Sequence, residues 1–167
     1  MTISMYQASI PVYDRLLGAL GAILGRAATW AEARKIDPAV LVNARLAPDM
    51  FALVRQVQIA CDFAKGAGAR LAGQEPPKYE DTETTFAALQ ARVDRTRQYL
   101  GTLSAGQIDG SESRLIKLKV GGQDLEFKGQ EYLLSVAMPN FYFHYTMVYA
   151  ILRHNGLDLG KREYLGS

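Results

Sequence analysis

Asn140 and His144 are the residues whose types and spacing most clearly suggest chemistry in this sequence. They lie four residues apart in the last long predicted helix, so their side chains point the same way. An amide and an imidazole on one helical face can hydrogen-bond a ligand or contribute to a metal site. The remaining groups of such a site must come from other helices, and the sequence does not show which helices pack together.

Gln58 and Asp62 form a second pair with the same spacing, in the helix predicted over 48–71. Their shared face is offset from the apolar stripe, which leaves open a solvated face or a site inside the bundle. If Asp62 faces inward, His144 is its expected partner, because a carboxylate fixes the tautomer of an imidazole. The sequence therefore predicts one polar pocket between helices, built from Gln58, Asp62, Asn140 and His144.

The chain has two histidines, His144 and His154. Ten helical residues rise about 15 Å, whereas a zinc–nitrogen bond is about 2 Å long, so the two cannot bind one ion within one chain. We expect His154 at the surface in the last helical turn, where a cation is favoured. His144 has three interpretations: a packed, hydrogen-bonded histidine among aromatic residues, a pocket-lining group, or a metal ligand.

The composition is that of one globular domain, which we expect to span residues 1–167. Hydrophobic residues make up 49% of the chain and charged residues 22%, an ordinary balance. The net charge is +2 with no basic run, so no nucleic-acid partner is expected. Cys61 is the only cysteine, which excludes an internal disulfide, suits a cytoplasmic location and predicts a small buried hydrophobic residue.

The sequence also gives no reason to expect a membrane partner. The N-terminal residues have neither the basic region nor the cleavage site of a signal peptide. The apolar stretches are interrupted well before the ~18 residues that span a bilayer.

Apolar residues at intervals of three and four predict the helices of a bundle. The first half of the chain is expected to contain a helix from Ser4 or Pro11 to about 26, a short helix over 29–35, one turn over 38–43, and a helix from Pro48 to 71–73. The second half is expected to contain a helix from Asp81 or Thr82 to about 100, and a helix after Gly129 that breaks at Pro139 and ends at 155–156. We expect Arg92, Arg95 and Arg97 to face water and the tail over 157–167 to be a loop.

The period of the pattern changes between the last two long helices. Apolar and charged residues alternate over 116–120 and again over 125–128, on either side of Gly121-Gly122. Such alternation around a glycine pair predicts a β-hairpin. Because two strands alone are marginally stable, the hairpin must lie on the bundle or pair with another chain. The predicted fold is an all-α four-helix bundle with a short β-hairpin between the third and fourth helices.

The run from Asn140 to Gly156 resembles the last helix of the DinB-like superfamily, whose members are four-helix bundles and include many metal-dependent enzymes. Their final helix carries His-x-x-x-His, followed two turns later by Leu-Arg and then Gly. His144 matches the second histidine because Leu152-Arg153 follows at that distance, and Asn140 stands in place of the first. The third ligand that the resemblance implies is a histidine on the second long helix, where this chain has Gln58 and Asp62 instead.

The whole chain resembles a bacterial family of unknown function within that superfamily. The stretches that carry this resemblance are LAPDMFALVRQVQIACDFAKGAGARLAG, EDTETTFAALQARV, FYFHYTMVYAILRHNG and LGKREYL. The resemblance implies the DinB-like fold rather than an activity, because two of the three metal ligands are replaced.

Three functions follow as hypotheses. In the first, the protein binds a small molecule or a partner in the polar pocket, without a complete metal triad and without a cofactor. In the second, it is a metal-dependent transferase or hydrolase that uses a divalent metal ion at His144, with Asp62 nearby. In the third, it is a non-catalytic structural homodimer joined through the tyrosine-rich last helix or the hairpin. DinB-like proteins are often dimeric, so the resemblance also implies a homodimer.

Overall fold

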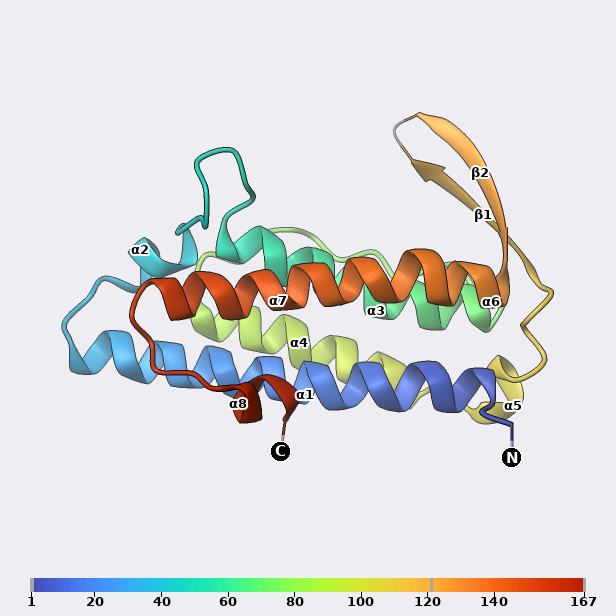
Figure 1. Cartoon of the computed structure of the whole chain (residues 1–167), viewed down its shortest axis with the longest axis horizontal. Coiled ribbons are helices and arrows are strands. Elements are labelled where there is room, and N and C mark those ends of the chain that lie inside the picture. The colour runs from blue at the N-terminus through green and yellow to red at the C-terminus, as the bar shows by residue number, and fades with distance from the viewer. Residues whose placement is uncertain (1, 121, 167) are drawn as a thin grey trace.

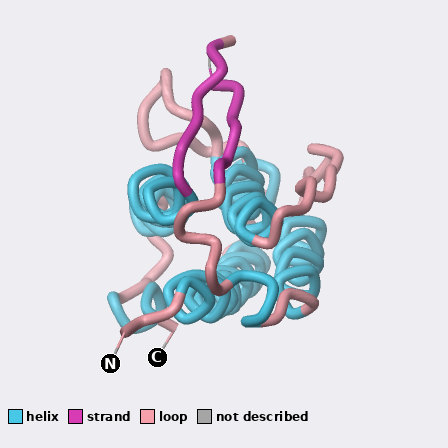
Figure 2. Tube along the Cα trace, turned by 90° about the vertical axis from the view of Figure 1, so that its right-hand side faces the viewer, coloured by secondary structure: helices cyan, strands magenta, loops and turns pink. Residues whose placement is uncertain are grey.

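Four long helices form a bundle in the computed structural model, which describes residues 2–120 and 122–166 (Figure 1). They are α1 (Met5–Ala33), α3 (Leu53–Leu71), α4 (Phe86–Gly101) and α7 (Met138–His154). Helix α1 packs against α4, α3 packs against α7, and α3 also contacts α4. The end-on view shows the four helices around a common centre (Figure 2). The predicted all-α DinB-like bundle with a hairpin between the third and fourth long helices is confirmed.

Helix α1 supplies one wall of the core. Its side chains at three- and four-residue intervals, among them Tyr13, Leu17, Leu20 and Leu24, are fully buried. The ring of Tyr13 meets Phe141 of α7 edge-on, with ring centroids 4.9 Å apart. The short separate helix predicted over 29–35 is wrong, since α1 continues to Ala33. Nothing between Arg26 and Thr29 stops it, because Ala27 and Ala28 favour helix.

Two other helix starts also differ from the prediction. Helix α2 (Pro38–Val42) confirms the predicted turn, but α3 begins at Leu53 rather than Pro48, because 45–52 forms a loop closed by Leu53 N donating to Ala44 O. Helix α4 begins at Phe86 rather than at 81–82. Its cap is Thr85, whose Oγ1 accepts a hydrogen bond from Ala88 N at 3.2 Å.

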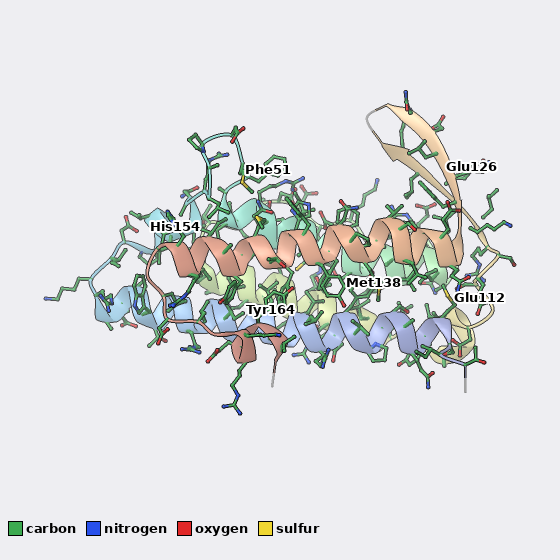
Figure 3. All side chains as sticks on the ribbon, viewed as in Figure 1. Phe51, Glu112, Glu126, Met138, His154 and Tyr164 are labelled. Atoms are coloured by element: carbon green, nitrogen blue, oxygen red, sulfur yellow. The ribbon has the colours of Figure 1, made fainter. Side chains whose placement is uncertain are left out.

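The hairpin pairs β1 (Leu115–Val120) with β2 (Gln123–Lys128), after the short helix α5 (Ala105–Ile108). Ile116 lies opposite Phe127, and Leu118 lies opposite Leu125. Gly121 of the predicted glycine turn lies outside the described residues. Ile116 is buried, and Leu118 and Phe127 pack against the core, so one face of the hairpin packs on the bundle, which is one of the two arrangements left open by the sequence. Glu126 lies on the part that rises beyond the helices (Figure 3).

The chain enters α7 through two short segments, α6 (Gly129–Glu131) and the π-helix η1 (Tyr132–Ala137). The predicted break at Pro139 is therefore wrong: the helix continues through Pro139, and the irregularity precedes it. Proline has no N–H to donate, and its ring crowds the carbonyl four residues back. The wider π turn, in which Met138 N donates to Leu133 O, leaves room for that ring.

The tail is partly helical, which corrects the predicted loop. Helix α8 (Lys161–Leu165) begins where Glu163 Oε2 accepts a hydrogen bond from Gly160 N at 2.8 Å. Tyr164 of α8 faces the bundle, where the centroid of its ring lies 4.7 Å from that of Tyr145 (Figure 3). None of the helices that the structure describes is long and apolar enough to cross a membrane.

Candidate functional site

His144 is buried, 8% exposed, and its hydrogen-bond partner is Gln56 of α3. The atoms His144 Nδ1 and Gln56 Oε1 lie 2.7 Å apart. Gln56 Nε2 donates to the carbonyl of Phe51 at 3.2 Å, which orients the amide so that its oxygen faces the imidazole. Because that oxygen only accepts, Nδ1 carries the proton, and Nε2 is the unprotonated nitrogen of the neutral ring.

Aromatic rings enclose the same histidine. Phe63 of α3 stacks on His144 with ring centroids 6.1 Å apart and an interplanar angle of 13°, and Phe143 meets it edge-on at 5.2 Å. Burial lowers the pKa of His144, and the nearby positive charge of Arg55 lowers it further. His144 is therefore a packed, hydrogen-bonded histidine among aromatic residues, the first of its three interpretations.

Gln58 and Asp62 lie in a different cluster, between α3 and the segment that leads into α4. Gln58 Nε2 donates to Glu83 Oε2 at 2.8 Å, and Asp62 Oδ1 accepts from Arg92 at 2.9 Å. Lys65 also pairs with Asp62, at 2.9 Å. Both residues thus have charged partners of their own, and among the described residues the structure places no hydrogen bond between Asp62 and His144.

Arg92 is the centre of this ionic cluster, and its predicted exposure is wrong. It is only 3% exposed and forms salt bridges with Asp62, Asp81 and Glu83, at 2.9, 3.0 and 3.0 Å. The pKa of Glu83 is lowered: burial alone would raise it, but hydrogen bonds from Gln58 and Arg92 outweigh burial. Glu83 has no other salt bridge among the described residues, so the inward position of Arg92 supplies its countercharge.

Asn140, on α7, lies apart from this cluster and close to strand β1 of the hairpin. Its Nδ2 donates to Val136 O, four residues back, at 2.7 Å. It also lines a cavity of about 340 Å³ between the hairpin, η1 and the groove between α3 and α7. The other residues that line this cavity are Phe63, Arg70, Lys117, Leu118, Lys119, Tyr132 and Val136.

The structure therefore separates the predicted site into parts. Asn140 lines the cavity, and His144 lies next to it through Phe63, whereas Gln58 and Asp62 belong to the Arg92 cluster. Sequence reasoning missed Gln56, Phe63 and Arg70. These three recur at intervals of seven along α3, a spacing that puts them on one helical face and could have identified them together.

Two single-residue predictions are confirmed. Cys61 is fully buried, and burial raises the pKa of its thiol to about 12, as for a small hydrophobic residue rather than a nucleophile. His154 is exposed in the last turn of α7, at the opposite end of that helix from Met138 (Figure 3).

The donor set around His144 does not fit the metal that DinB-like resemblance implies. Catalytic zinc is held by three protein ligands drawn from His, Cys, Asp and Glu. Within residues 2–120 and 122–166, no group of three or more such residues is placed to hold an ion. The groups that contact His144 are the Gln56 amide, engaged on both of its atoms, and the rings of Phe63 and Phe143. We therefore derive no chemical step through a metal.

The helical bundle with its inserted hairpin and this α3–α7 groove place the protein in the DinB-like class. The chain belongs to the family described as a domain of unknown function, DUF1993, which matches residues 5–165. It is also similar to a solved DinB family member protein from Shewanella denitrificans, with 42% sequence identity and a TM-score of 0.87. That similarity covers 97% of this chain and 92% of the other. No curated protein matches the chain.

Proposed function

We propose that this DinB-family protein binds a small molecule in the cavity between the hairpin and the α3–α7 groove. The observation that carries the proposal is the lining of that cavity, in which four separate segments contribute both apolar and polar side chains. Ligand sites are concave, largely apolar and equipped with a few convergent polar groups. This cavity combines the apolar Phe63, Leu118 and Val136 with the amide of Asn140.

The walls of the cavity are fixed by contacts behind them. His144 stacks on Phe63, and the Gln56 hydrogen bond holds the imidazole in place. The π-helix sets the direction of Tyr132 and Val136, and single π turns are frequent at functional sites. A pocket that is formed before its ligand arrives loses less conformational entropy on binding.

A neutral fluorescent probe tests this proposal without assuming the natural ligand. We expect 1-aminoanthracene to gain fluorescence on binding the wild-type protein, and Val136→Trp to abolish the gain because the indole fills the cavity. Leu134→Trp is the matched control, since Leu134 lies on the same π-helix, is 54% exposed and does not line the cavity. Absence of binding to the wild-type protein, or equal binding to both variants, would contradict the proposal.

A metal-dependent transferase or hydrolase is the alternative, and its test is independent. Elemental analysis of protein purified without an affinity tag should give no stoichiometric zinc or nickel, because His144 lacks the partners that such an ion requires. Near-stoichiometric metal that disappears in His144→Ala would replace the binding proposal with the enzymatic one.

A further inference from the structure

The charged residues that line the cavity beneath the hairpin are all positive. Arg70 lies within it, while Lys117 and Lys119 border it from β1, and its described lining residues include no carboxylate. Lys117 is partly neutralised by Glu126, whose Oε1 lies 2.9 Å from its Nζ. Among the described residues, Arg70 and Lys119 form no salt bridge, whereas Arg92 on the other side of α3 has three carboxylate partners.

Arg70 is held in position rather than extended into water. Its Nη1 donates to Tyr132 Oη at 3.2 Å, and its guanidinium carbon lies 5.9 Å from the centroid of the Tyr132 ring. This contact uses one of the five N–H donors of the guanidinium. A positioned guanidinium with further donors is suited to a carboxylate or phosphate, which it can bind through two parallel hydrogen bonds.

Gly66 leaves the space that the guanidinium of Arg70 occupies. It lies one turn before Arg70 on α3, and a Cβ built there would be 2.5 Å from Arg70 Nη1. The missing side chain is therefore what allows the guanidinium to fold back along its own helix. Any larger residue at 66 would displace the guanidinium while leaving its charge in the protein.

We propose that the ligand of this cavity is an anion, a small molecule with a carboxylate or phosphate group attached to an apolar body. This inference rests on the proposed function, because it names the ligand class of the same cavity. The anionic group binds the guanidinium of Arg70. The apolar body lies against Phe63 and Val136, and Asn140 offers a hydrogen bond to a polar substituent.

Competition against 1-aminoanthracene measures the preference directly. Phenyl phosphate and benzoate carry the two candidate anionic groups, and benzamide is a neutral molecule of similar shape. We expect both anions to displace the probe at concentrations about tenfold lower than benzamide, since hydrogen bonds between charged groups are roughly twice as strong as neutral ones. The better of the two anions identifies the group that the natural ligand carries.

Two variants link that preference to Arg70. Arg70→Met should weaken phenyl phosphate by about tenfold or more, as expected for a lost charge-assisted hydrogen bond, while 1-aminoanthracene still binds. Gly66→Ala should weaken it in the same direction with no change of net charge. Lys128→Met is the matched control on the hairpin, because it removes one positive charge from a residue that does not line the cavity.

The possible results separate the two proposals. If 1-aminoanthracene binds but the anions compete no better than benzamide, the anion inference is wrong and the cavity proposal stands. If the anions compete equally well against wild-type and both Gly66→Ala and Arg70→Met, Arg70 is not the recognition group and the inference is again overturned. If 1-aminoanthracene does not bind the wild-type protein, the proposed function itself fails.

Discussion

The burial of His144 beside Gln56 makes the stability of the folded protein depend on pH. In the unfolded chain a histidine titrates near pH 6.5, whereas burial and Arg55 lower the pKa of His144 in the folded protein. The unfolded state therefore binds more protons as the pH falls below about 6.5, and folding loses stability in that direction. The stabilising contribution of the neutral ring is fully present above that value.

We predict that wild-type protein unfolds at lower urea concentration at pH 5.5 than at pH 7.5. One proton gives a slope of at most about 1.4 kcal/mol for each pH unit below the unfolded-state pKa. His144→Gln should flatten this dependence, since glutamine does not titrate. Glu83 does not interfere, because its lowered pKa confines its contribution to more acidic solution. Equal pH dependence in wild-type and variant would show that His144 is not the responsible group.

The surroundings of some single residues can be predicted from the sequence, and those of others cannot. The exposure of His154 and the burial of Cys61 follow from position and neighbours, and both were predictable. The partner of His144 was not, because Gln56 and Asp62 both belong to α3 and only packing decides which of them faces α7. The burial of Arg92 does not follow from the sequence either, because the three carboxylates that surround it come from other segments.

At the scale of elements, the ionic cluster fastens α4 and the segment before it to α3. Arg92 reaches Asp62 on α3 and also Asp81 and Glu83 in the irregular chain ahead of α4. Tyr79 of that same segment lies beneath the guanidinium of Arg95, whose central carbon is 4.0 Å from the ring centroid. Gln58 and Asp62 thus hold the bundle together instead of lining the cavity.

We predict that Arg92→Met destabilises the protein by about 3 kcal/mol, because it leaves the largely buried Glu83 without a charged partner. It also removes one of the two cations that pair with each of Asp62 and Asp81. Arg95→Met, an exposed site on the same helix, should cost about 0.5–1 kcal/mol from the lost cation–π contact. Urea unfolding of the two variants at pH 7.5 provides the comparison. A loss for Arg92→Met no larger than that for Arg95→Met would contradict the structural role of the cluster.

Element types were easier to predict from the sequence than element boundaries. The alternation around Gly121-Gly122 identified the hairpin, and the apolar stripes identified all four long helices. The starts of α3 and α4 lie later than the sequence predicts. The loop before α3 is closed by the hydrogen bond from Leu53 N to Ala44 O, and the segment before α4 is held by the contact of Arg55 with Asp81. The π-helix η1 could not be predicted from the sequence, because Pro139 is compatible both with a break in the helix and with a widened turn before it.

At the scale of the whole molecule, α7 and η1 expose several large apolar side chains. Leu134 is 54% exposed and Phe143 is 52% exposed, and Tyr142 lies beside Phe143 on the same helix. Exposed apolar side chains are a common feature of subunit interfaces. The homodimer implied by DinB-like resemblance would cover these residues by isologous packing of the last helix.

We predict that light scattering at micromolar concentration gives a mass near twice 18.4 kDa. Phe143→Glu should shift the protein towards the monomer, because a charge on a self-complementary interface meets its own copy or an apolar partner surface. Lys161→Glu is an exposed control on α8, outside this surface. A wild-type monomer under these conditions would remove the structural-homodimer hypothesis.

Mapping a bound ligand onto the backbone tests most directly whether the cavity beneath the hairpin binds an anion. Titration of phenyl phosphate into ¹⁵N-labelled protein should shift the amide signals of Gly66, Arg70, Lys119 and Asn140, while those of Tyr79 and Arg95 stay in place. Shifts concentrated around Tyr79 and Arg95 would move the site to the other side of α3. Unchanged spectra at millimolar phenyl phosphate would contradict an anion-binding cavity in this protein.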